Sequence, residues 1–358
     1  MGKIEIDHTG SGGGITLSSD GTSLLLGGTA IGGGGGGGAD LYAVETTGST
    51  DPTASGTLSV AIGSDAVASG SSAIAIAHGT DATGNYSVAL GRYSQATAEY
   101  TVAIGSSAAA SVANGVAIGL LATASQQGAI AFGRSRASGA ESFAAAITNN
   151  LSSYGAIGSY SVALSRNAKA SNSNAIAIGY ATQATGSGSL AVGYGSESTD
   201  YQAYSFGREA KSATKGKLAY ASGQFAAVGD AQGGQFILRA DTTDATATVL
   251  TTNNSTAGSD DQIVAASDTC ITFDGTITAM QNGAQAYASW KIEGLLVNDG
   301  GTTTLANSAT TVIQNLSSWG MALSADNTNN ALAITVTGEA AHNIRWVANI
   351  RTTEVTYA

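Results

Sequence analysis

The chain has 358 residues and a formal net charge of −11, with 49 glycines, one proline, one cysteine, 6% aromatic and 11% charged residues. So few large core-forming and charged residues argue against an ordinary globular enzyme, and the single Cys270 excludes an internal disulfide. Lys and Arg are not clustered, so nucleic-acid binding is not expected. The sequence shows no signal-peptide pattern and no run of about eighteen apolar residues, so neither export by a cleaved signal nor membrane insertion is expected.

Residues 1–38 contain short apolar runs followed by a glycine run. Ser19, Asp20 and Gly21 form a turn sequence between two such runs and predict a hairpin, while Gly32 to Gly38 predict a flexible joint. Because apolar side chains are unfavourable in a segment that stays in water, we interpret this part as an anchor peptide, with a disordered tail as the alternative. The anchor residues are Ile4, Ile15, Leu24, Leu25 and Leu26.

From Ser59 to about Gly223 one five-residue phrase occurs in twelve copies, of which the first reads SVAIG. The copies begin 14 residues apart except near Ser142, from which the next copy, at Ser161, is 19 residues away. β-Branched residues at alternate positions predict strands, and the period is too short for a helical hairpin. A second short strand, as in AVASG at 66–70, and corners of Gly and Ser complete each coil, so residues 39–227 predict a parallel β-roll, or solenoid.

Such a thin roll has apolar positions on more than one face. We therefore expect several identical rolls to associate side by side with closed rotational symmetry. The pattern does not settle which strand face meets the partner chains. The residues assigned to the repeat core and trimer assembly are Val60, Ile62, Val88, Val102, Ile104, Val116, Ile118, Ile176 and Ile178.

The repeated phrase resembles the head repeat of YadA-like trimeric adhesins, whose copies read close to AxAxG followed by SVAIG. The resemblance covers somewhat under half of the chain. It implies a left-handed parallel β-roll that packs as a homotrimer.

Residues 228–358 change to strand-length runs divided by Asn, Asp, Gly and Ser, which predicts an antiparallel β-sandwich. The phrases WKIEGLLVN at 290–298, LAITVTG at 332–338 and NIRWVANIRTTEVTYA at 343–358 resemble the C-terminal domain of bacteriophage tail-fibre and virion structural proteins. Trp290 and Trp346 lie in alternating strands and are predicted core residues. The candidate receptor-binding residues lie in turn-like sequence: Trp319, Asp326, Asn327, Asn329 and Asn330.

Residue patterns for catalysis or cofactor binding are weak. His8, His78 and His342 lie in three different segments without a second His or Cys at ligand spacing, so neither a metal nor another cofactor is expected. No nucleophile-elbow or phosphate-loop sequence occurs in the required context, and the chain is not expected to be an enzyme.

These inferences predict an all-β fibre of a bacteriophage virion, a homotrimeric rod that projects a C-terminal adhesion domain. The N-terminus is expected to bind other virion proteins, and the C-terminal domain a glycan or protein of the host surface. The expected location is the surface of the virion, after assembly in the host cytoplasm. Alternatives are a capsid decoration or head fibre without a receptor role, and a fragment of a bacterial trimeric adhesin, for which a signal peptide and a heptad stalk are lacking.

Overall fold

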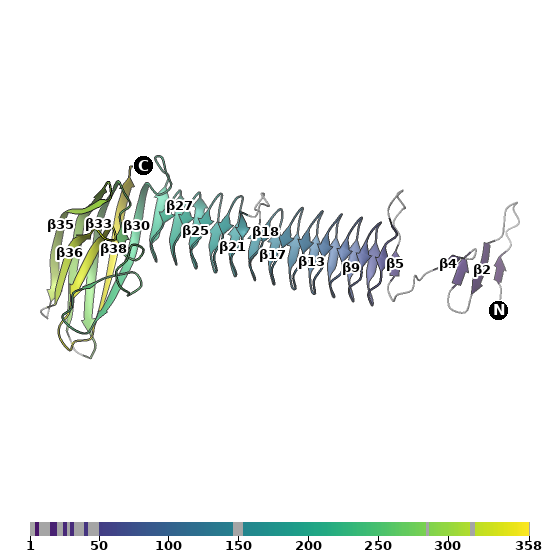
Figure 1. Ribbon diagram of the computed structural model, residues 1–358, viewed down its shortest axis with the longest axis horizontal. Coiled ribbons are helices and arrows are strands. Elements are labelled where there is room, and N and C mark those ends of the chain that lie inside the picture. Colours follow the sequence, from purple (N-terminus) through teal and green to yellow (C-terminus); the bar gives the residue numbers. More distant parts are fainter. Residues whose placement is uncertain are drawn as a thin grey trace. The chain divides into compact units, whose positions relative to one another are not determined.

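The computed structural model describes residues 50–145, 153–283, 286–315 and 319–357, together with the backbone of five short strands before residue 50 (Figure 1). The described residues contain strands and turns but no helix, which confirms the all-β class. Accordingly, they include no helix that could cross a membrane. The chain forms two compact units, Met1–Ser152 and Ser153–Ala358.

The first unit begins with a small antiparallel sheet in the order β1-β2-β3-β4. Its strands are β1 (Ile4–Ile6), β2 (Ile15–Ser19), β3 (Leu24–Leu26) and β4 (Thr29–Ile31). The pairing of β2 with β3 confirms that the two apolar runs form a hairpin. The predicted anchor residues Ile4, Ile15 and Leu24 to Leu26 lie in these strands, but their side chains and the glycine run 32–38 lie outside the described residues.

Each coil of the first unit has a long strand of three residues and a short strand of two. Strands of one kind pair in parallel with the equivalent strands of neighbouring coils, so that Val102 lies between Val88 and Val116. The long strands are β7 (Val60–Ile62), β9 (Ile74–Ile76), β11 (Val88–Leu90), β13 (Val102–Ile104), β15 (Val116–Ile118), β17 (Ile130–Phe132) and β19 (Phe143–Ala145), and β5 (Ala39–Leu41) pairs with β7. The short strands are β6 (Thr53–Ala54), β8 (Val67–Ala68), β10 (Asp81–Ala82), β12 (Gln95–Ala96), β14 (Ala109–Ala110), β16 (Thr123–Ala124) and β18 (Arg136–Ala137).

The second unit begins with coils of the same kind. Their long strands are β21 (Val162–Leu164), β23 (Ile176–Ile178), β25 (Leu190–Tyr194), β27 (Tyr204–Arg208) and β29 (Leu218–Ser222). Their short strands are β20 (Gly155–Ala156), β22 (Lys169–Ala170), β24 (Gln183–Ala184), β26 (Glu197–Ser198) and β28 (Lys211–Ser212). Seven long strands in the first unit and five in the second match the twelve copies of the phrase and confirm the parallel β-solenoid.

Alanine fills the inside of the coils. The second residue of each long strand from β7 on, such as Ala103, and the second residue of most short strands, such as Ala110, are completely buried. Neighbouring side chains of a strand point to opposite faces, so the larger residues that flank the central alanine point outward and are only half-buried or exposed. The assignment of a repeat-core role was therefore wrong for Val60, Ile62, Val88, Val102, Ile104, Val116, Ile118, Ile176 and Ile178, which lie on the outside of a coil too narrow for them.

Glycine after the long strand lets successive coils stack closely. Gly105 has φ 124°, and a Cβ built on it would lie 2.5 Å from the carbonyl oxygen of Gly119 in the next coil. This left-handed backbone and close approach explain the final glycine of the repeated phrase. Ala77 and Ser165 adopt a similar backbone, with φ 115° and 93°, in two other coils.

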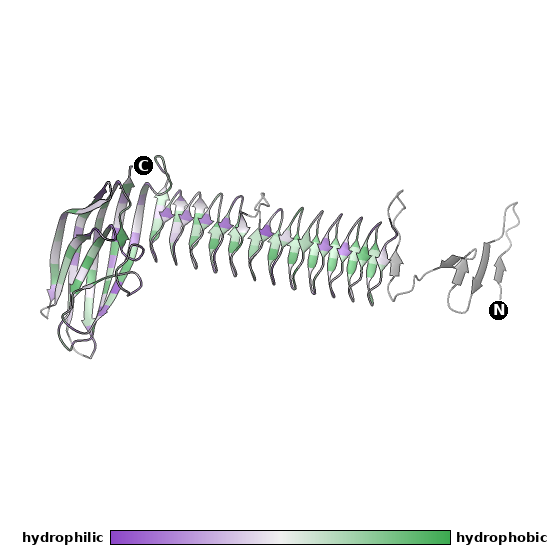
Figure 2. Ribbon diagram, in the orientation of Figure 1, coloured by the Kyte–Doolittle hydropathy of each residue, from purple (hydrophilic) through white to green (hydrophobic). Residues whose placement is uncertain are grey.

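The C-terminal part of the second unit consists of two antiparallel sheets around one core. The larger sheet has the order β30 (Ala231–Thr242), β38 (Ile344–Thr356), β33 (Thr269–Gln281), β34 (Tyr287–Asp299) and β35 (Thr302–Asn315). In the smaller sheet, β37 (Ala331–Thr337) pairs with β36 (Gly320–Asp326) on one edge and with β31 (Thr248–Val249) and β32 (Ile263–Val264) on the other. Burial alternates residue by residue along β38, and Figure 2 shows both hydrophobic and hydrophilic residues along the strands of the sheet. The predicted antiparallel architecture is thus confirmed.

The last coil joins this domain directly. β29 pairs with β30, so that Leu218 lies opposite Gln235, and the ammonium of Lys217 lies 2.6 Å from the buried carboxylate of Glu354. The last coil strand ends at Ser222 and β30 begins at Ala231. The division into 1–38, 39–227 and 228–358 stays a proposal.

Candidate functional site

The two ends of the C-terminal domain differ in what surrounds them. At the proximal end, where β30 begins and β38 ends, the last coil packs against the sheet. At the distal end, β30 ends at Thr242 and β38 begins at Ile344, opposite each other in the register, and β33 ends beside them. The distal end therefore holds the turns that the solenoid does not cover.

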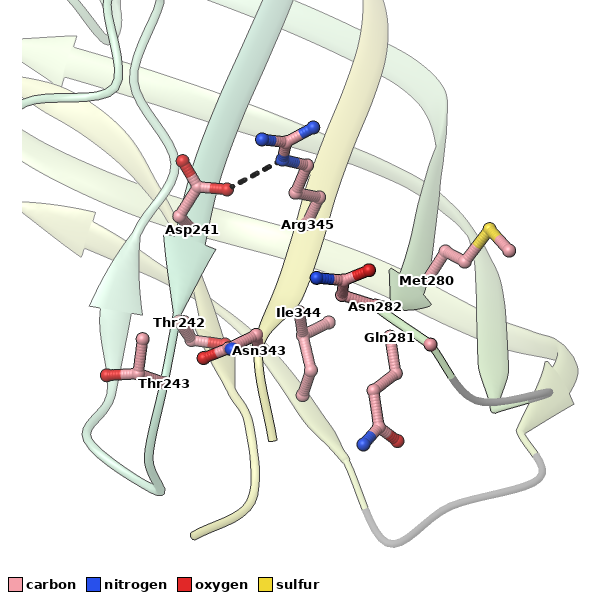
Figure 3. Close-up of a pocket in the computed structure, with 10 residues that line it drawn as sticks. Asp241, Thr242, Thr243, Met280, Gln281, Asn282, Asn343, Ile344 and Arg345 are labelled. Atoms are coloured by element: carbon pink, nitrogen blue, oxygen red, sulfur yellow. Dashed lines mark hydrogen bonds and ion pairs between the residues drawn. The ribbon is translucent and has the colours of Figure 1, made fainter. Parts of the chain in front are cut away.

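A hollow of about 550 Å³ lies at the distal end (Figure 3). Its walls come from the end of β30, the end of β33 and the start of β38. In the sequence, these lining residues extend from Asp241 to Arg345. The sheet register brings Asp241 and Met280 opposite Arg345 from either side. The lining residues are Asp241, Thr242, Thr243, Met280, Gln281, Asn282, Gly283, Asn343, Ile344 and Arg345.

Polar groups surround a partly apolar floor in this hollow. The Arg345 Nε donates to Asp241 Oδ1 at 3.3 Å, yet the Arg345 side chain is 88% exposed, so most of its guanidinium is free to meet a ligand. Asp241 also accepts a hydrogen bond from Asn254. Ile344 is buried, whereas Met280 is exposed. Amide, hydroxyl and guanidinium groups beside an apolar surface are suited to a small polar ligand, and the volume is within the usual range of about 300–1,000 Å³.

The predicted binding turn around Asp326 lies at the proximal end instead. Asp326 accepts hydrogen bonds from the backbone of Asn329, from the Asn329 amide at 2.7 Å and from Gln262 at 3.1 Å. Burial raises the pKa of Asp326, but these hydrogen bonds and one from the Thr328 backbone outweigh it, so the pKa lies below its ordinary value. The carboxylate is therefore occupied within the turn.

Two neighbouring asparagines of that turn are also occupied within the fold. The Asn327 side chain accepts from the Thr303 backbone at 2.7 Å, and the Asn330 side chain accepts from the Thr303 hydroxyl at 3.3 Å. They attach the β36–β37 turn to the start of β35. Asp326, Asn327, Asn329 and Asn330 therefore have structural contacts, and a receptor role for them stays only a prediction.

Trp319 lies in the core. Its ring is 3% exposed and tilts against Trp346 at a centroid distance of 5.7 Å, while Trp290 stacks on Trp346 at 5.8 Å. The Trp346 indole donates to the Thr242 hydroxyl. The core prediction for Trp290 and Trp346 is confirmed, and Trp319 is removed from the candidate binding residues because its indole does not reach the surface.

A cluster that sequence reasoning did not find lies in the first unit. The Ser64 hydroxyl lies 2.9 Å from His78 Nδ1, Asp65 lies 3.5 Å from the same nitrogen, and His78 Nε2 lies 3.2 Å from the Tyr93 hydroxyl. A hydrolytic relay needs the nucleophile and the carboxylate on opposite ring nitrogens. Here both approach Nδ1, so the arrangement does not form that relay. The 14-residue spacing of Ser64 and His78 in adjacent coils is the signal that could have revealed the contact.

The described residues also contain no group of three or more His, Cys, Asp or Glu side chains that could hold a metal ion. His342 contacts Glu339, and His8 lies outside the described residues.

The coils present two unlike outer faces. Outward residues of the long strands, which we call the long-strand face, are apolar in successive coils, with ladders such as Val88, Val102 and Val116. Outward residues of the short strands, the short-strand face, are mainly polar or small. In the first unit they are Thr53, Val67, Asp81, Gln95, Ala109, Thr123 and Arg136, and in the second they include Lys169, Gln183, Glu197 and Lys211. Of these two faces, the long-strand face is therefore the one that resembles a surface covered by another chain.

Comparisons with known proteins agree with the solenoid. The YadA head domain repeat family matches residues 54–76, 82–108, 113–135 and 170–196, all within the coils. No curated protein matches the chain. Among solved structures, the tailspike protein gp49 of Acinetobacter baumannii bacteriophage Fri1, a capsular polysaccharide depolymerase, matches with 10% identity and a TM-score of 0.22 over 86% of this chain. The chain spans 48% of the length of that tailspike.

The tailspike match contradicts the prediction that the chain is not an enzyme, because the matched protein is itself an enzyme. At this identity and TM-score, however, the likeness indicates neither a reaction nor an active-site residue for this chain. The YadA head match supports placing the solenoid with the fibres and adhesins built from this repeat.

Proposed function

We propose that the protein is a trimeric fibre that presents three copies of the C-terminal domain to a ligand on a cell surface. The observation that carries this proposal is the difference between the two outer faces of the coils. A chain that repeats apolar outward residues over coil after coil needs a cover for them, whereas the short-strand face needs none.

A closed ring of identical chains covers the long-strand face of every chain and leaves no apolar face exposed. The YadA head repeats support three as the number of chains, in keeping with the sequence resemblance. The outward-facing set from Val60 to Ile178 is then the assembly surface, although it is not the core of a coil.

Within this class we propose a bacteriophage virion fibre, located on the particle surface and assembled in the host cytoplasm. Residues 1–38 would bind other virion proteins, and the distal hollow around Arg345 would bind a glycan or protein of the host. The C-terminal phrases that resemble phage fibre proteins support this choice. A bacterial surface adhesin is the second candidate, supported by the YadA head repeats themselves.

The assembly is tested with Val116→Asp, on the long-strand face, and Ala109→Asp, its control on the short-strand face. Asp81 already occupies the position equivalent to Ala109, so an acidic side chain is tolerated there. We expect Val116→Asp to sediment as a folded monomer because a carboxylate without a partner cannot be buried between chains. Ala109→Asp should sediment as the trimer. A monomeric wild type, or a trimer with Val116→Asp, would contradict the proposal.

A further inference from the structure

Strand β35 (Thr302–Asn315) ends the larger sheet and is its most exposed strand. It pairs with β34 along one edge, and β38 is not available to it because β30 and β33 occupy both edges of β38. Residues 306–314 are all exposed. Figure 1 shows β35 at the side of the sheet away from β30. In the described part of the chain, no strand is paired along the second edge of this stretch.

The face of β35 that belongs to the core side is also uncovered. Val312 lies opposite Trp290, which is 3% exposed, yet Val312 itself is 57% exposed. Its neighbour Ile313, at a β-bulge, is 58% exposed. Leu305 of the same strand packs against the buried core, whereas residues 306–314 are exposed. Residues 306–314 of β35 therefore lie outside the buried core and have both an unpaired edge and exposed apolar side chains.

β35 lacks the features that normally protect a sheet edge. Natural edge strands are protected by charges, prolines or a covering segment. β35 contains no charged residue and no proline, whereas each of the other four strands of its sheet carries charged residues. Residues 228–358 have four basic and twelve acidic side chains, so two copies of this domain repel each other unless they meet through a surface without charged residues. β35 provides such an uncharged surface, which favours a second copy of this chain as its partner.

We propose that β35 of one chain packs against the C-terminal domain of another chain in the assembled protein. This inference rests on the proposed trimer, in which the associated solenoids hold the three domains together. Such a tether gives an effective concentration of the order of mM, so a contact too weak to join free domains is sufficient. The contact buries Val312 and Ile313 and gives hydrogen-bond partners to the free edge of residues 306–314.

The test is amide hydrogen exchange on the full chain, read over residues 306–314. We expect the amides of this stretch that are not bonded to β34 to exchange at least about tenfold more slowly in the wild-type trimer than in the Val116→Asp monomer. The central residues of β33 serve as the internal reference, since β34 and β38 cover both edges of that strand in either state. Fast exchange of 306–314 in a trimer confirmed by sedimentation would overturn this inference and leave the proposed function intact. Equal protection in the monomer would also overturn it.

A substitution tests the same contact in a second way. Ile313→Asp places a charge at the predicted contact, and Ile237→Asp places one at an exposed isoleucine on β30. We expect only Ile313→Asp to speed exchange of residues 306–314 while the trimer remains. Equal exchange rates in the two variants would contradict the inference. A wild type that sediments as a monomer would instead overturn the proposed function on which the inference rests.

Discussion

At the scale of single residues, the junction between the last coil and the C-terminal domain contains a buried ion pair. Lys217 and Glu354 are both nearly buried, and the Glu354 carboxylate also accepts from Gln232 and from the Thr352 hydroxyl. Burial raises the pKa of Glu354, but the Lys217 charge and these hydrogen bonds outweigh it, so the pKa lies below its ordinary value. The ionised carboxylate is thus stabilised by the fold.

We predict that Glu354→Gln lowers the free energy of unfolding of this domain at pH 7 by about 3–5 kcal/mol, because Lys217 is left buried without a counter-charge. The folded-state pKa of Glu354 is lowered, so its contribution is present above the ordinary Glu pKa of about 4.3 and is lost as pH falls through the folded value. Denaturant unfolding at pH 7 and at lower pH should show the difference between wild type and variant shrinking with acid.

The control is Glu293→Gln, which removes an exposed carboxylate 3.6 Å from Lys291. This substitution should change stability by less than about 1 kcal/mol. An equal loss in both variants would mean that burial of the Lys217 pair has no special role.

At the scale of elements, the β36–β37 turn illustrates a structural role for residues that resemble a binding loop. We predict that Asp326→Ala lowers the free energy of unfolding by about 1–3 kcal/mol, because it removes the acceptor of backbone and side-chain hydrogen bonds. Ligand binding by the folded variant should be unchanged. Thermal unfolding and cell binding measure the two effects, with the neighbouring exposed residue in Thr328→Ala as control. Loss of cell binding without loss of stability would return this turn to the candidate receptor site.

Sequence reasoning succeeded for the coils because a period repeated twelve times fixes strands, corners and parallel pairing together. It misplaced residues such as Val60 and Ile62 because two-residue alternation separates two faces without saying which one is inside. In these coils the inside holds small side chains, mostly alanine and in the last coils also serine, so the larger residue of each pair is outside. Composition gave a hint, since alanine is the residue that recurs between them.

The distal hollow could not be predicted in the same way. Asp241, Gln281 and Arg345 are far apart in sequence, and each alone reads as an ordinary surface residue at a strand end. Only the antiparallel register of β30, β38 and β33 brings them to one end of the sheet. Trp319 was misjudged for the opposite reason, because a glycine neighbour suggested a turn where the sheet packing buries the ring.

At the scale of the whole molecule, the solenoid and the C-terminal domain divide the proposed work between them. In the proposed fibre, the coils would supply a repeated assembly surface, and the distal hollow would supply one ligand site for each chain. In a trimer, three identical sites would act on the same cell surface. Their combined strength would then exceed that of one site without any new contact.

We predict that binding to cells depends on this multiplicity. The Val116→Asp monomer should bind about 10²- to 10⁴-fold more weakly than the wild-type trimer, because the second and third sites no longer bind at high effective concentration. Arg345→Ala should remain a trimer but also bind more weakly, because it removes the exposed guanidinium of each hollow. Labelled full-length protein is titrated onto a panel of bacterial strains at fixed salt, with Ala109→Asp as the trimeric control. Equal binding by monomer and trimer would exclude multivalency, and unchanged binding by Arg345→Ala would move the ligand site away from the distal hollow.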